Sequence, residues 1–306
     1  MKEENNHMAT VLKRDELFTP ERIAGMINKV KGHSSLALLT QQEPVAFNGN
    51  EMFTFSLDKD IDLVDEGGAK TPGGATIDKV KMLPVKVEYS ARFSDEMWFS
   101  GEEAQLNILK EFTDGYAKKL ARGLDLMSFH GVNPRTKLAA TLIDGKSFDD
   151  AINQTIEYDA TKADDVLEDA IFLIQNSEGI ITGIAMAPVV GRDLSKIEVN
   201  GVRQYPEFRM GAKPDNLAGM KVDINETVSA VGDTSIYVGD FANSVKWGYA
   251  KNIGLQVHTA GDPDNSGRDL AGHNEILLRS ETYLGWGILD KNSFARVVKP
   301  AAGGGE

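Results

Sequence analysis

The glycine-rich segment 67–74 contains the residues of this 306-residue chain that come closest to a nucleotide-binding loop. Lys70 and Thr71 lie there between two glycine pairs. A phosphate-binding loop needs the spacing G-x-x-x-x-G-K-[ST] and a following helix, whose N-terminal amides bind the phosphate. Here Ala69 precedes the lysine, Val64 stands where the first glycine belongs, and a strand-like pattern follows. The sequence therefore predicts a mobile extended loop instead of a nucleotide site.

Residues 261–275 resemble the first half of a calcium-binding loop. Its first, third, fifth and sixth positions are occupied by Asp262, Asp264, Ser266 and Gly267. The twelfth position, which should carry a glutamate, is His273, and no helical pattern flanks the segment. We expect a solvated hairpin loop and no metal.

Gly285-Trp286-Gly287 is a fragment of a dinucleotide-binding fingerprint. It lacks the third glycine, the following helix and the room for a βαβ unit. A pair of strand glycines that lets two backbones approach closely is the expected alternative.

No other catalytic or metal-binding pattern is visible. The five histidines show no metal-binding spacing; they are His7, His33, His130, His258 and His273. The chain has no cysteine, which excludes thiolate nucleophiles and disulfides, and no G-x-S-x-G nucleophile motif occurs. We therefore expect no catalytic residue and no cofactor, although an acid–base pair of carboxylates brought together only by folding stays open.

The overall composition narrows the class of partner. The net charge of −13 argues against broad binding to a phosphate backbone, which needs clustered lysine and arginine. The N-terminal residues lack the apolar core of a signal peptide, and no apolar run approaches the ~20 residues of a membrane span. A soluble, cytoplasmic protein without membrane contact is expected.

Periodicity predicts the elements that position these segments. Helices are expected from Pro20, over 101–129 and over 162–176, and strands over 52–57 and 85–93. Short strands and turns are expected from residue 217 onward, which together with the helices indicates an α+β fold.

One segment lacks a core-forming face. Residues 58–82 form a polar, glycine-tipped excursion between the two predicted strands. Such a long excursion is uncommon in a self-contained domain. Its partner is therefore expected to be another copy of the chain.

Six stretches, in this order, resemble the major capsid proteins of tailed bacteriophages, which have the Hong Kong 97 fold. They are 19–36, 62–96, 120–134, 186–205, 236–257 and 277–297. The first is similar to an N-arm helix followed by a serine-containing strand, and the second to the E-loop and the strand after it. The resemblance covers roughly residues 18–300. It departs from the family at Leu63-Val64, where an aromatic residue is usual.

The resemblance implies a division of the chain. The expected parts are an N-arm (1–33), a P-domain (34–57, 83–150 and 275–300), an E-loop (58–82), an A-domain (151–274) and a disordered tail (301–306). The long helix would be the spine of the P-domain. The implied E-loop contacts between subunits are Asp65, Glu66, Gly67, Gly68, Lys70, Gly73 and Gly74. Some family members cross-link a lysine to an asparagine of a neighbour, and Lys70 or Lys79 with Asn292 could take those roles.

The implied function is mechanical. Copies would form pentamers and hexamers of an icosahedral virion head that encloses double-stranded DNA without sequence-specific binding. Assembly would take place in the host cytoplasm with a separate scaffolding protein, a portal and possibly a decoration protein. The alternatives are an encapsulin-like nanocompartment shell, a tail-tube or other phage structural protein, and a soluble α+β enzyme.

Overall fold

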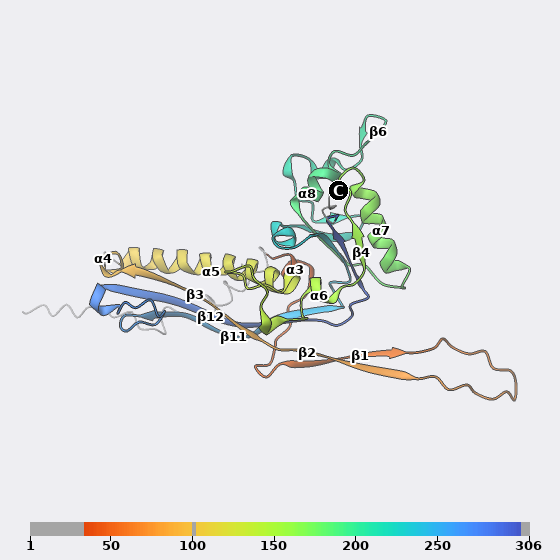
Figure 1. The fold of residues 1–306 in the computed structure, drawn as a ribbon, viewed down its shortest axis with the longest axis horizontal. Helices are drawn as coiled ribbons and strands as arrows, with labels where there is room; N and C mark the ends of the chain where they lie inside the picture. The colour runs from red at the N-terminus through yellow and green to blue at the C-terminus, as the bar shows by residue number, and fades with distance from the viewer. Residues whose placement is uncertain (1–33, 100–101, 301–306) are drawn as a thin grey trace, which may run out of the picture. The chain divides into compact units, whose positions relative to one another are not determined.

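The computed structural model describes residues 34–99 and 102–300 (Figure 1). The predicted N-arm with its helix from Pro20, and the predicted disordered tail, lie outside these residues. The described chain is α+β, as predicted. It divides into two compact units. The first contains Glu88–Ala117, apart from 100–101, and Asn252–Glu281; the second contains 34–87, Lys118–Lys251 and 282–300. The boundaries expected for the P- and A-domains differ from these and stay predictions.

The elements are as follows. The α-helices are α3 (Ser35–Leu39), α4 (Asp95–Trp98), α5 (Glu102–His130), α6 (Phe148–Ala151), α7 (Ala163–Gln175) and α8 (Pro188–Leu194). The strands are β1 (Asn50–Leu57), β2 (Ala75–Met82), β3 (Val85–Ser94), β4 (Thr155–Glu157), β5 (Gly183–Met186), β6 (Glu198–Val199), β7 (Val202–Arg203), β8 (Asn216–Leu217), β9 (Met220–Ile224), β10 (Thr234–Gly239), β11 (Val245–His258), β12 (Glu275–Ile288) and β13 (Phe294–Val298). Short 3-10 helices are η1 (Thr141–Ile143), η2 (Pro206–Gly211), η3 (Glu226–Ser229) and η4 (Ala271–His273).

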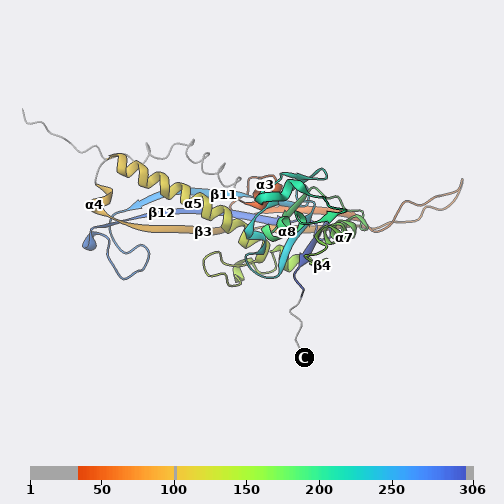
Figure 2. The ribbon, with the colours of Figure 1, turned by 90° about the horizontal axis from the view of Figure 1, so that it is seen from above.

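In the first unit, the first half of α5 packs on a three-stranded sheet of order β11-β12-β3 (Figure 2). The helix buries Ile108, Leu109 and Phe112, and the sheet meets them with Leu255 and Leu278. The apolar stripe of the predicted 101–129 helix therefore does face a core. The long helix is confirmed, and so is the helix predicted over 162–176, which is α7.

The second unit is built on a six-stranded mixed sheet of order β4-β13-β10-β5-β9-β8. Alternation along β10 sends side chains to both of its faces. Ile236 and Val238 join the core under α7 and α8, while Tyr237 points the other way and stacks on Phe129, with ring centroids 4.6 Å apart. Phe148 packs against the same Tyr237 ring at 5.6 Å. The end of α5 is therefore fixed to the sheet by aromatic rings.

The serine-containing strand that the resemblance implies after the N-arm helix is instead the helix α3. Two contacts explain the difference. Ser34 Oγ accepts a hydrogen bond from the amide of Ala37, 3.2 Å away. The carboxylate of Asp125, on α5, accepts the amides of Ser35 and Leu36 at 3.0 and 3.2 Å. A carboxylate at a helix N-terminus stabilises that helix, and this one comes from a distant part of the chain.

The strands after residue 217 were expected to be short. β11 and β12 instead have 14 residues each. Glycines allow other backbone to pass close to them. A Cβ placed on Gly248 of β11 would lie 1.6 Å from the carbonyl oxygen of Glu43.

We predict that Gly248→Ala destabilises the second unit by about 3 kcal/mol or more, because the backbone around Glu43 must move. Gly115→Ala is the matched control. A Cβ at exposed Gly115 in α5 meets no atom within 4 Å, so we expect a gain of roughly 0.5–1 kcal/mol from helix propensity. Urea unfolding of both variants measures whether each substitution lowers or raises the free energy of unfolding. Equal effects would contradict this account of Gly248.

Candidate inter-subunit surface

β1 and β2 form a two-stranded antiparallel hairpin (Figure 1). Phe53 pairs with Lys79, and Phe55 pairs with Ile77. The sequence placed 75–82 in a polar excursion between strands, whereas the structure makes it the partner of the first strand. A two-stranded ribbon is at best marginally stable alone in water. What covers its faces is therefore the central question about this segment.

The base of one face packs on β12. A Cβ at Gly287 would lie 3.2 Å from Met52 Cε and 3.5 Å from Val80 Cγ1, and one at Gly285 would lie 3.1 Å from the carbonyl oxygen of Leu83. Met82 is fully buried there. The two glycines thus admit close backbone approach, which confirms the interpretation made from the sequence.

The opposite face of the hairpin is apolar and exposed. Its residues, which we call the apolar hairpin face, are Phe53, Phe55, Leu57 and Ile77, and between 65% and 69% of each is exposed. Their register places them together on one side of the ribbon. An exposed apolar surface rimmed by polar residues marks an interaction site. The sequence predicted that the first three share a face, but not that this face is left uncovered.

An ion pair closes this face at its base. Lys79 Nζ lies 2.7 Å from Glu51 Oε2, and both side chains are about half exposed. The hydrogen bond from Lys79 lowers the pKa of the Glu51 carboxyl below its usual value. A pair this exposed adds little to stability. The pair lies on the same side of the ribbon as Phe53 and adds charge beside the apolar hairpin face.

All seven predicted contact residues lie in the loop 58–74 that joins the two strands, and all are exposed. Gly67 has a φ of +80°, which favours glycine, and the amide of Gly68 donates to the carbonyl of Asp65 at 2.9 Å. The loop is closed at its base, where Asp58 Oδ1 accepts the amide of Gly74 at 2.6 Å. The predicted residues therefore share one exposed loop, and their role in contacts stays a prediction.

The phosphate-site pattern has no supporting geometry in this loop. Lys70 and Thr71 lead into β2, so no helix N-terminus follows them. Thr71 donates instead to Asp62 within the loop. Two apolar side chains here, Ile61 and Leu63, are almost completely exposed, at 101% and 97%. They extend the apolar character of the hairpin toward its tip.

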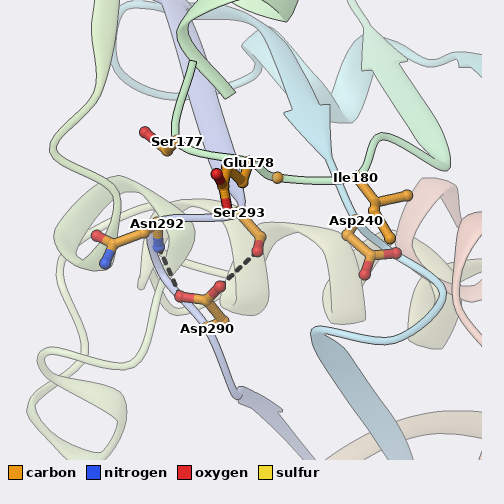
Figure 3. Close-up of a pocket in the computed structure, with 8 residues that line it drawn as sticks. Ser177, Glu178, Ile180, Asp240, Asp290, Asn292 and Ser293 are labelled. Atoms are coloured by element: carbon orange, nitrogen blue, oxygen red, sulfur yellow. Dashed lines mark hydrogen bonds between the residues drawn. The ribbon is translucent and has the colours of Figure 1, made fainter. Parts of the chain in front are cut away.

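A surface pocket in the second unit holds Asn292, the candidate cross-linking residue (Figure 3). Its other lining residues are Ser177, Glu178, Gly179, Ile180, Asp240, Asp290 and Ser293. The Asp290 carboxylate accepts hydrogen bonds from the backbone amide of Asn292 at 3.0 Å and from the Ser293 hydroxyl at 2.5 Å. The Asn292 side chain points away from this turn (Figure 3). The Asp290 carboxylate is thus engaged in shaping a turn.

A buried titratable cluster lies where α5 ends. Asp149 Oδ2 lies 2.7 Å from His130 Nδ1, and its Oδ1 accepts hydrogen bonds from Tyr237, Thr234 and Arg296, each at 2.8 Å. The other ring nitrogen of His130 lies 2.9 Å from the carbonyl oxygen of Thr227. Sequence reasoning missed this cluster because its members are far apart in the chain. It ties α5, α6, η3, β10 and β13 together.

The cluster around Asp149 leads to a prediction about how stability changes at acid pH. Burial opposes ionisation of Asp149, but the hydrogen bond from His130 and further donors outweigh it, so its pKa lies below the usual value. A depressed folded pKa adds stability above the unfolded pKa of about 4, which is lost as pH falls through the folded pKa. Asp149→Asn should be about 3 kcal/mol less stable at pH 7. The difference in free energy of unfolding between this variant and the wild type, measured by urea unfolding, should become smaller below pH 4. A difference that does not change with pH would contradict the role given to the Asp149 carboxylate.

Among 34–99 and 102–300, no group of three or more histidine, aspartate or glutamate side chains is placed to hold a metal ion. No helix in that same part of the chain is both long and apolar enough to cross a membrane.

Comparison with known proteins gives matches to solved structures only. No protein-family model and no curated protein sequence matches the chain. Solved structures do match it over nearly its whole length. A chain from Mycobacterium phage Ogopogo is 28% identical, with a TM-score of 0.75 over 87% of this chain and 92% of that one. A chain from Gordonia phage Cozz is 22% identical, with a TM-score of 0.74 over 88% and 87%.

A third match names the kind of particle. A chain from the capsid of a native gene-transfer-agent particle has a TM-score of 0.60 at 15% identity, over 87% of this chain and 90% of that one. The chain has the fold of these phage and gene-transfer-agent capsid structures. The family and the fold predicted from the sequence are thereby confirmed.

Proposed function

We propose that this capsid protein is the major shell subunit of a tailed-phage head, and that its copies form the pentamers and hexamers of an icosahedral shell around double-stranded DNA. The likeness to phage structures over almost the whole chain supports the proposal. So does the gene-transfer-agent capsid, which was solved with C5 symmetry. The role is structural, and no catalytic step is assigned to any residue.

The hairpin is the proposed inter-subunit contact. The described residues leave its apolar hairpin face uncovered, and among them neither strand pairs with a third strand. Exposed edges and apolar faces favour association with another chain. The predicted tip residues, from Asp65 to Gly74, would contact the neighbour beyond the strands. Because each subunit makes the same contact, modest contacts add up over a closed shell.

The charge suits a container for DNA. A net charge of −13 repels packaged DNA instead of adsorbing it. We propose further that a separate scaffolding protein and a portal take part in assembly in the host cytoplasm, and that a decoration protein can bind the finished virion. The N-terminal arm over residues 1–19 would clasp a neighbouring subunit. A cross-link of Lys70 or Lys79 to Asn292 would appear as covalent ladders on denaturing gels of mature particles; a single monomer band would exclude it.

Negative-stain microscopy of the expressed chain, alone and with a candidate scaffolding protein, tests the proposal. Closed icosahedral particles or capsomer rings are expected. The content of the particles separates a phage head from an enzyme-loaded compartment. A monodisperse monomer under both conditions would overturn the proposed function.

A further inference from the structure

The loop 58–74 presents carboxylates and apolar side chains next to one another. Its residues 60–66, which we call the acidic tip, contain four acidic residues and no basic one. The apolar side chains of Ile61 and Leu63 lie among them and are almost completely exposed. The side chain of Thr71 donates to Asp62 within the loop itself. The acidic tip is therefore left uncovered by the described part of its own chain.

The second unit also carries a surface of the opposite charge. Lys119 and Arg122 lie three residues apart on α5, which places them on one face of the helix. The loop 132–146 folds back on this part of α5, since a Cβ at Gly123 would lie 3.5 Å from Pro134 Cγ. Charged side chains of the helix and of the loop are therefore neighbours.

Lys137, in this loop, lies in the field of both helix cations. Partial burial, and then the charges of Arg122 and Lys119, lower the pKa of Lys137 below its usual value. Glu226, which forms an ion pair with Arg122, opposes this effect. Like charges held close together repel, and a carboxylate placed between them relieves the repulsion. The three cations thus favour an acidic partner.

Two apolar side chains stand beside these cations. Leu138 and Leu142 are 70% and 81% exposed. The stretch 135–142 contains two basic residues and no acidic one, although acidic residues outnumber basic ones by 46 to 33 in the whole chain. We call the combined set the basic loop surface; it consists of Lys119, Arg122, Arg135, Lys137, Leu138 and Leu142.

We propose that the acidic tip of one subunit docks on the basic loop surface of a second copy of this chain. Both surfaces combine charge with exposed apolar side chains, so the carboxylates of the tip meet the cations while its apolar side chains cover the two leucines. Opposite charges set the register of an interface, and apolar contact removes area from water. A phosphate backbone would match the cations but not the leucines. The inference rests on the proposed function and deepens it, because it names the surface that receives the tip of the hairpin.

Single cysteines test this contact cleanly, because the chain has none of its own. Untagged copies with Leu63→Cys, the tip copies, are expressed together with tagged copies carrying Leu138→Cys, the receiving copies. Their assemblies are treated with a short bismaleimide cross-linker, and we expect a covalent dimer of one tip copy and one receiving copy. In the control, Phe172→Cys replaces Leu138→Cys, since Phe172 on α7 is 63% exposed and lies outside the basic loop surface. The control should give at least about tenfold less mixed dimer, because its thiol lacks the high effective concentration of a docked pair.

Charge reversal tests the attraction itself. Lys119→Glu with Lys137→Glu in the receiving copy should lower the yield of mixed dimer about tenfold, because like charges across an interface repel. Asp65→Lys with Glu66→Lys in the tip copy should restore the yield. Lys118→Glu is the matched control for Lys119→Glu. Adjacent helix residues face different directions, so this control should leave the yield unchanged.

The outcomes separate this inference from the proposed function. If wild-type chains form shells but the tip and receiving copies give no more mixed dimer than the Phe172→Cys control, the inference is overturned and the proposed function stands. The same conclusion follows if the lysine reversal leaves the yield unchanged, or if the reversal in the tip copy fails to restore it. A wild-type chain that stays monomeric would overturn both.

Discussion

Phe53→Asp together with Phe55→Asp prevents shell formation and leaves the subunit folded. Both side chains lie on the apolar hairpin face and are 65% and 66% exposed, so the isolated chain loses little packing. In a shell they would be covered by a neighbour, and a buried aromatic anchor contributes about 2 kcal/mol or more to an interface. Two such losses, about 4 kcal/mol, weaken each contact roughly a thousandfold.

The control places the same charges on the other side of the ribbon. Ser56 and Thr76 are exposed partners in the same register, and replacing both with aspartate adds two carboxylates away from the apolar hairpin face. Sedimentation and circular dichroism read out assembly and folding. We expect shells from the control and folded, unassembled subunits from the Phe53/Phe55 variant. Normal shell yield from the Phe53/Phe55 variant would show that this face is not a contact.

Asp125→Ala has the largest expected effect on folding. The carboxylate is completely buried and accepts the amides of Ser35 and Leu36 and the hydroxyl of Thr227, the last at 2.6 Å. Ser34 also donates to it. Removing the acceptor leaves several buried donors unpaired, at about 1–3 kcal/mol each. We expect a loss of about 4 kcal/mol in the free energy of unfolding, measured in urea.

The direction in which this loss of stability changes with pH tests whether the buried Asp125 carboxylate causes it. Burial raises the pKa of Asp125 to about 6. A folded pKa above the unfolded value means that the folded state binds the proton more tightly, so the contribution of this group to stability grows as pH falls from above 6 toward 4. The effect of Asp125→Ala should therefore be about 1 kcal/mol larger at pH 5 than at pH 7.

Asp223→Ala is the control for Asp125. Asp223 accepts a hydrogen bond from the Ser35 hydroxyl at 2.5 Å but none of the α3 amides. A loss of about 1 kcal/mol is expected, which is typical of a single side-chain hydrogen bond. If the two variants were equally stable, the buried carboxylate would not be what holds α3 in place.

Local pattern was enough to predict the long elements. The stripe that includes Leu109, Phe112 and Leu120 repeats at helical spacing, and all three side chains are buried in α5. An apolar stripe at helical spacing indicates which face of the helix packs against the core, even when the residues of that core are unknown. The order of such elements was also sufficient to indicate the capsid family.

Contacts between distant residues account for what could not be predicted. The helix α3 depends on Asp125, which lies 90 residues from Ser35 in the chain. The loop between β11 and β12 is held by Arg92, which lies 170 residues from Asp262. The second strand of the hairpin was missed because nearly all of its residues are exposed, so its sequence does not show one buried and one exposed side. In each case the residue that determines the local structure lies outside the short stretch of sequence from which that structure is predicted.

Electron cryo-microscopy of assembled particles tests the central claim most directly, since it shows what covers the hairpin. We predict closed shells in which β1 and β2 of each subunit lie against a neighbouring copy, with Phe53 and Phe55 buried in that contact. Shells in which the apolar hairpin face stays open to solvent, or folds back on its own subunit, would contradict the account.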